Sequence, residues 1–165
     1  MTKRYGSFRG ARLQAVPPLP PIGALGGSFE KRLAFDSFEA AASPAIAVGD
    51  KIWIGNISLE ARLDPASMYY YDALGASTTL SVGDEANPAA LAAAASTSSA
   101  GSRSLVASVD IADYPKPLWQ QLGYASLDAA KAAQPLKNGY VDLYFTVGGA
   151  AIVGTLTWQL RGCDN

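Results

Sequence analysis

The sequence predicts an all-β fold: an antiparallel β-sandwich or jelly-roll-like domain with two short helical insertions and an extended N-terminal arm. Short stretches of alternating apolar and polar residues recur along the chain, separated by turn-forming residues roughly every ten positions. An α/β fold would instead require long helical patterns between the strands, and the sequence has none. The chain has 165 residues, 49% of them hydrophobic, which suits a single domain with one packed core.

Residues 1–27 are predicted to form the arm, and residues 28–165 the sandwich domain. The arm holds four basic residues and no acidic one, then a cluster of prolines, and ends in glycines. Such prolines favour an extended or polyproline II backbone, and the glycines allow a joint. Three roles stay open: a tail that is free or packed along its own domain, a docking segment that orders on a neighbouring subunit, or a weak nucleic-acid contact. The candidate docking anchors are Arg4, Tyr5, Phe8, Arg9, Arg12 and Leu13.

The first half of the domain shows a series of strand patterns. A strand is expected over residues 31–38, and Pro44 then interrupts the pattern because proline cannot donate a ladder hydrogen bond. Further strands are expected at residues 45–48, 51–57, 58–63 and 67–72. The last of these contains Tyr69, Tyr70 and Tyr71, and Tyr70 must face opposite to its two neighbours. One face therefore presents tyrosine outward, so all three are candidate interface residues.

The first helical insertion is predicted from Pro88 to about Ala95, after a strand over residues 77–82. Asp84 and Glu85 would place negative charge at the start of the helix, where it is favourable, and Asn87 could cap it. Proline fits the first helical position, and the alanines that follow are the strongest helix formers.

The second half of the domain should begin with a polar loop at residues 96–102 and a strand at residues 105–111. The second insertion, residues 113–137, should contain two short helical pieces, residues 118–122 and a helix capped by Ser126. Strong alternation then predicts a strand at residues 140–147. A second strand at residues 152–160 would return through Gly148 and Gly149 as a β-hairpin.

Composition excludes several kinds of chemistry. The net charge is −1, with 13 basic and 14 acidic residues, so we expect neither nucleic acid nor a membrane surface as a partner. The chain has one cysteine, Cys163, and no histidine. These counts exclude an internal disulfide and a Cys/His zinc site, and they remove most hydrolase mechanisms, which need a histidine base.

Two carboxylate pairs remain as catalytic candidates: Asp84 with Glu85, and Asp110 with Asp113. Helix capping would explain the first pair and a strand end the second, and sequence proximity does not create the cleft that a glycosidase needs. Asp84, Glu85 and Asn87 offer oxygen ligands for calcium, but the rest of a twelve-residue loop is missing. We therefore expect no catalytic residue, no cofactor and no metal.

A series of turn motifs carries a resemblance. It comprises ARLDP at Ala61 to Pro65, DALG at Asp72 to Gly75, and STTLSVG at Ser77 to Gly83, with the strand pair from Tyr140 to Leu160. The series resembles small virion structural proteins of tailed bacteriophages and phage-like particles, the head decoration, cement or spike-base class.

The resemblance implies a non-enzymatic virion subunit that is assembled in the host cytoplasm. Copies would associate as a trimer or pentamer, and the arm would dock on the major capsid protein or other virion proteins. A carbohydrate-binding or adhesin-like sandwich, or a neck or tail component of the virion, stays open as an alternative. A small carboxylate enzyme would need its Asp and Glu side chains to converge in one pocket.

Overall fold

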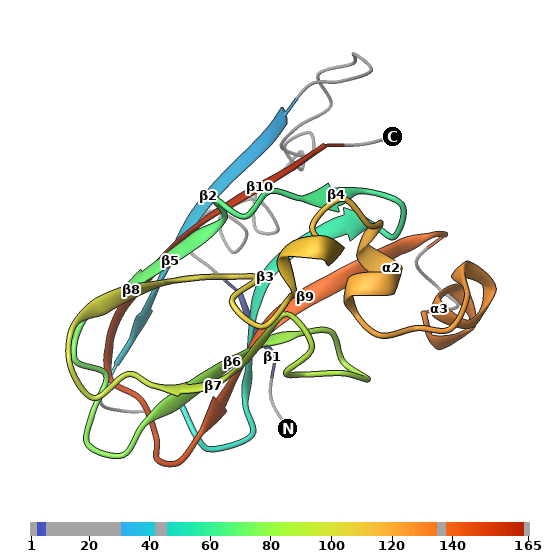
Figure 1. The fold of residues 1–165 in the computed structure, drawn as a ribbon. Helices are drawn as coiled ribbons and strands as arrows, with labels where there is room; N and C mark the ends of the chain where they lie inside the picture. Colours follow the sequence, from blue (N-terminus) through green and yellow to red (C-terminus); the bar gives the residue numbers. More distant parts are fainter. Residues whose placement is uncertain (1–2, 6–30, 42–45, 135–137, 164–165) are drawn as a thin grey trace, which may run out of the picture.

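Two β-sheets face each other in the computed structural model, which describes residues 3–5, 31–41, 46–134 and 138–163 (Figure 1). The first sheet has the strand order β1-β3-β9-β6-β7, with bounds Lys3–Tyr5, Lys51–Ser58, Tyr140–Gly148, Thr79–Gly83 and Ala92–Ser96. The second sheet has the order β2-β10-β5-β8, with bounds Lys31–Ala40, Gly154–Cys163, Met68–Tyr71 and Gly101–Ser104. A short strand, β4 (Arg62–Leu63), pairs with β10. Strands β1 and β3 run parallel, and the other pairs of named strands are antiparallel. The predicted all-β sandwich is confirmed.

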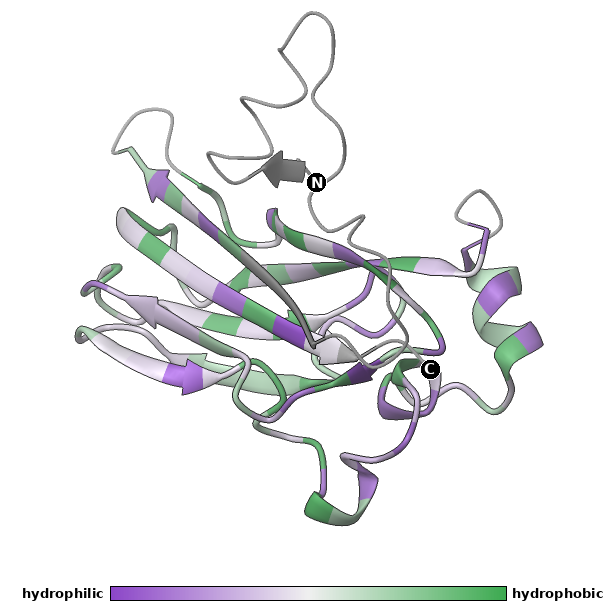
Figure 2. Cartoon of the chain, turned by 90° about the horizontal axis from the view of Figure 1, so that it is seen from above, coloured by the Kyte–Doolittle hydropathy of each residue, from purple (hydrophilic) through white to green (hydrophobic). Residues whose placement is uncertain are grey.

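The core lies between the two sheets and follows the alternation of their strands. Bands of hydrophobic and hydrophilic residues alternate along the strands in Figure 2. Phe145 on β9 and Trp158 on β10 meet edge to face with ring centroids 5.5 Å apart. The indole Nε1 of Trp158 donates to the backbone oxygen of Ile54 at 3.1 Å, across the sandwich. Trp158 thus joins the two layers by both packing and a hydrogen bond.

The helical segments lie together between β8 and β9 in the sequence. They are η1 (Ile111–Asp113), α2 (Leu118–Gln121) and α3 (Leu127–Ala133). Ser126 caps α3, since its Oγ accepts from the backbone N–H of Ala129 at 3.1 Å. The second predicted insertion, with its two short helices, is therefore confirmed.

The first predicted insertion is wrong, because the alanine run forms strand β7. Its backbone pairs antiparallel with β6, placing Ala92 opposite Val82 and Ala95 opposite Leu80. The chain before β7 folds back over Gly83, where an added Cβ would lie 2.0 Å from the backbone oxygen of Asn87. Alanine favours a helix by only a small free energy per residue, and tertiary pairing overrides that preference here.

The predicted hairpin of residues 140–160 is also wrong, although both of its strands exist. Strand β9 pairs with β3 and β6 in the first sheet, whereas β10 pairs with β2 and β5 in the second. The connection crosses between the sheets, and in it Ile152 forms an isolated bridge with Ile46. The sequence pattern shows that each strand has one apolar face. Such a face can be buried by two strands of one hairpin or by two strands that lie in facing sheets, so the pattern alone does not decide between them.

Three further strand predictions are wrong or only partly confirmed. Residues 105–111 form turns and the start of η1, because consecutive Leu105 and Val106 are both buried and so break the alternation of a strand. Residues 58–63 are predicted as one strand, but Ser58 ends β3, a turn follows it, and only Arg62–Leu63 form a separate strand, β4. The expected strand at residues 45–48 is reduced, in its described part, to the bridge at Ile46.

Replacing Tyr69 by phenylalanine is expected to raise the free energy of unfolding by about 1 kcal/mol. The Tyr69 side chain is fully buried, and its hydroxyl has no hydrogen-bond partner among the described residues. Urea denaturation at pH 7 measures the change. Tyr140→Phe is the control, because that residue is 42% exposed and should change stability by less than about 0.5 kcal/mol. A clear loss of stability in Tyr69→Phe would mean that the hydroxyl is satisfied.

The same variant should change the alkaline stability of the protein. Burial raises the pKa of Tyr69 to about 12. Because this pKa is higher in the folded state than in the unfolded state, the protonated phenol contributes to the free energy of unfolding. That contribution is complete below pH 10 and is lost as the pH rises toward 12. The stability advantage of Tyr69→Phe over the wild type should therefore grow between pH 10 and 12.

Candidate protein-interaction surface

The outer face of the second sheet presents small polar side chains around one exposed tyrosine. Tyr70 on β5 lies opposite Thr157 on β10 and opposite Ser102 on β8. Tyr70 is 45% exposed, whereas its neighbour Tyr69 is fully buried. We call this surface the Tyr70 face, and its other outward-facing members are Phe35, Ser37, Glu39, Met68, Ser104, Thr155 and Gln159.

A shallow depression of about 410 Å³ lies on the Tyr70 face. It is lined by Tyr70, Tyr71, Asp72, Ala100, Gly101, Thr155 and Thr157. Gly101 sits against the ring of Tyr71, since an added Cβ would lie 3.1 Å from the Tyr71 hydroxyl oxygen. The absence of a side chain at Gly101 therefore leaves room for this ring, which stacks on Tyr69 on the core side of the sheet.

Negative charge gathers at one end of this depression. Thr155 lies opposite Glu39 on β2, and on its other side its backbone oxygen accepts from the N–H of Asp72 at 3.1 Å. Both carboxylates are exposed, and neither forms an ion pair with a described residue. The residues that line the depression include no basic side chain. Two carboxylates beside the exposed Tyr70 ring favour cationic ligands, through charge-assisted hydrogen bonds and cation–π contacts.

The structure distributes the predicted interface tyrosines over different environments. Alternation left open which face of this strand turns outward, and in the structure it is the face of Tyr70, while Tyr71 is half-buried. Tyr69 lies in the core, where its ring contacts Phe145 at a centroid distance of 5.1 Å. An interface role for Tyr69 would therefore be indirect.

The predicted arm residues are described only in part. The backbone of Arg4 and Tyr5 belongs to β1, which pairs with β3 of the same chain. The other candidate anchors, Phe8, Arg9, Arg12 and Leu13, lie outside the described residues.

Sequence reasoning missed the residues that complete the depression, above all Asp72, Thr155 and Gly101. The alternation of residues 152–160 did indicate that Thr155 and Thr157 face away from the apolar side. Their proximity to Tyr70 was hidden, because it depends on the pairing of β10 with β5.

The first carboxylate pair serves the local structure. Asp84 is fully buried and accepts from the N–H of Asn87 at 2.6 Å and from the Tyr124 hydroxyl at 2.5 Å. Burial and the hydrogen bond to Asp84 raise the pKa of the Tyr124 phenol. The Asp84 carboxylate thus stabilises the turn between β6 and β7, where the sequence predicts the start of a helix.

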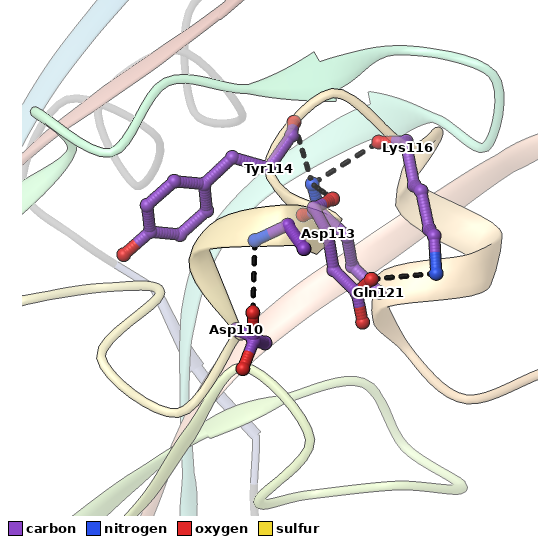
Figure 3. A network of polar contacts seen from close by, with 6 residues as sticks. Asp110, Asp113, Tyr114, Lys116 and Gln121 are labelled. Atoms are coloured by element: carbon purple, nitrogen blue, oxygen red, sulfur yellow. Dashed lines mark hydrogen bonds and ion pairs between the residues drawn. The ribbon is translucent and has the colours of Figure 1, made fainter.

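The second carboxylate pair shapes the loop around η1 (Figure 3). Asp110 caps η1 by accepting from the N–H of Ala112 at 2.8 Å, and Asp113 pairs with Lys116. The side-chain amide of Gln121 donates to three backbone oxygens of the same loop, those of Asp113, Tyr114 and Lys116. The polar groups of this loop are thus used to fix its backbone.

No group of three or more His, Cys, Asp or Glu side chains is placed to hold a metal ion in the part of the chain that the structure describes. None of the described helices has the length and apolar character needed to cross a membrane.

Comparison with solved structures identifies similar folds. The structure is similar to a chain in the capsid of Ralstonia phage GP4, with a TM-score of 0.54 and 14% identity, over 89% of this chain and 91% of that one. It is also similar to a chain in the capsid asymmetric unit of cyanophage Pam1, with a TM-score of 0.53 and 14% identity, over 88% of this chain and 94% of that one. No protein family model matches the sequence, and no curated protein is significantly similar to it. What is shared is therefore the fold.

Proposed function

We propose that this chain is a non-enzymatic structural protein of a tailed-phage virion, a head decoration, cement or spike-base subunit. The observation that carries the proposal is the fold shared with chains of two phage capsids. Each overlap spans close to nine tenths or more of both chains, so the matched proteins have nearly the same length as this one. The likeness is thus to whole small proteins and not to one domain of a much larger chain.

Strand topology supports the proposal. When β1 and β4 are left aside, eight strands form two four-stranded sheets with the orders β2-β10-β5-β8 and β3-β9-β6-β7. We infer that this arrangement is a jelly roll, a fold of eight strands in two sheets that recurs in viral capsid proteins and in lectins. The same topology keeps a carbohydrate-binding module as the alternative function.

The proposed mechanism is mechanical. Copies of the domain would associate around a symmetry axis as a trimer or pentamer, and the basic arm would lie on the capsid or on a neighbouring copy. On a repeating lattice, many weak contacts act together, so the overall attachment exceeds the affinity of any one contact. A near-neutral net charge of −1 gives little repulsion between copies and suits close assembly.

The full chain is expected to form a closed trimer or pentamer in solution. Light scattering measures the mass, and sedimentation with phage capsids measures docking. A chain that stays monomeric, binds no capsid and instead retains a glycan on an array would replace this proposal with the carbohydrate-binding alternative.

The double substitution Arg9→Ser and Arg12→Ser should weaken association roughly tenfold, because it removes the charges that would pair with acidic surface. Substitution is preferable to deletion of the arm, since residues 3–5 form β1. The control is Lys116→Ser with Lys131→Ser, which removes two charges from exposed positions outside the arm. Equal effects of the two variants would argue against a docking arm.

A further inference from the structure

We propose that the depression on the Tyr70 face receives residues 17–21 from the arm of a neighbouring copy. The inference rests on the proposed function, because it requires copies to assemble. The segment reads PPLPP, and such sequences favour polyproline II. Grooves lined by aromatic side chains bind this conformation, whose ordering costs little entropy. Tyr70 supplies an exposed ring, and Thr155 and Thr157 supply small polar neighbours.

Charge complementarity selects this segment as the occupant. The arm carries Arg9 and Arg12 upstream of the prolines and has no acidic residue, whereas Asp72 and Glu39 flank one end of the depression. Polyproline II rises by about 3.1 Å per residue, so Arg12 can reach roughly 15 Å from Pro17. Glu39 and Asp72 sit on opposite sides of β10, about 10 Å apart by strand spacing. A basic residue near a bound proline segment can therefore reach either carboxylate.

Geometry favours a neighbouring copy over the chain's own arm. Lys31 begins β2 at the end far from the depression, because Lys31 lies opposite Cys163 whereas Glu39 lies opposite Thr155. The distance along β2 between Lys31 and Glu39 is roughly 26 Å. The ten residues from Pro21 to Lys31 could span at most about 31 Å in polyproline II, and a Gly-rich segment of that length averages only about 18 Å. The arm of a neighbouring copy starts from that copy's own β1 and β2, so the distance between Lys31 and Glu39 of the receiving domain does not limit it.

Photo-crosslinking in the full chain tests the inference. Tyr70 is replaced by p-benzoylphenylalanine, equal amounts of isotopically light and heavy protein are mixed, and adducts are mapped by mass spectrometry. We expect adducts with residues 9–21, half of them joining a light chain to a heavy one. The control places the same amino acid at Tyr140, which is 42% exposed on the other sheet, against 45% for Tyr70.

Three outcomes would overturn the inference: no adduct with the arm, an equal yield from position 140, or adducts confined within single chains. The last would mean that each arm occupies its own domain.

A charge exchange separates this inference from the proposed function. Asp72→Arg should weaken self-association at least fivefold, and adding Arg12→Glu to the same chain should restore it. Light scattering measures both variants. If the wild type assembles and Asp72→Arg has no effect, the inference fails while the proposed function stands. If the wild type neither assembles nor binds capsids, the proposed function fails as well.

Discussion

Replacing Trp158 by alanine is expected to lower the free energy of unfolding by about 3 to 5 kcal/mol. The Trp158 side chain is 1% exposed and is among the largest fully buried side chains. Its truncation would open a cavity between the two sheets, remove the edge contact with Phe145 and leave the backbone oxygen of Ile54 without its donor. Urea denaturation measures the loss, provided that the transition is two-state.

Two control variants divide this effect into its parts. Trp158→Phe keeps most of the buried ring but removes the donor, so it should cost less, about 1 to 3 kcal/mol. Thr157→Ala changes the exposed neighbour on the same strand and should stay within about 0.5 kcal/mol. If Trp158→Ala cost no more than Thr157→Ala, the assignment of Trp158 to the centre of the sandwich would be wrong.

Replacing Gly149 by alanine is expected to prevent the native connection between β9 and β10 and to lower the free energy of unfolding by more than about 3 kcal/mol. Gly149 has a φ of 70°, and an added Cβ would lie 1.9 Å from the backbone oxygen of Ser77. Backbone cannot move aside as a flexible side chain can, so the crossover between the sheets would have to shift. Thermal unfolding followed by circular dichroism measures the effect.

Gly123→Ala is the matched control for Gly149→Ala. Gly123 has a φ of 85°, but nothing lies within 4 Å of its added Cβ. Its substitution should lower the free energy of unfolding by about 1 to 2 kcal/mol, which is the cost of holding a residue with a Cβ in the left-handed conformation. Equal losses in the two variants would show that backbone conformation alone matters and that the contact with Ser77 is unimportant.

The site shows how a surface can be assembled from separate segments. Tyr70, Gly101 and Thr155 come from three strands, and the pairing of β5 with both β8 and β10 brings them together. Only the opposite direction of Tyr70 and its two neighbours could be predicted, because it depends on alternation within one strand. The acidic end of the depression also depends on β2, because Glu39 lies on that strand. Strand β2 is far from β5 and β10 in the sequence.

The sequence by itself determined which face of β9 and which face of β10 is apolar. Alternation places Phe145 and Trp158 on the apolar faces of their strands, and the structure buries both. Local capping chemistry placed the start of α3 after Ser126. These features depend on residues within one or two turns of each other, so a local pattern is enough to predict them.

The tertiary structure decided the choice of partners. Alternation looks the same in a strand of a hairpin and in a strand of a facing sheet, so it could not assign β10 to the second sheet. The alanines of β7 have a weak helical preference, and pairing with β6 outweighs it. Strand pairing depends on residues that are distant in sequence, and its free energy is gained only when those residues meet in the folded sandwich.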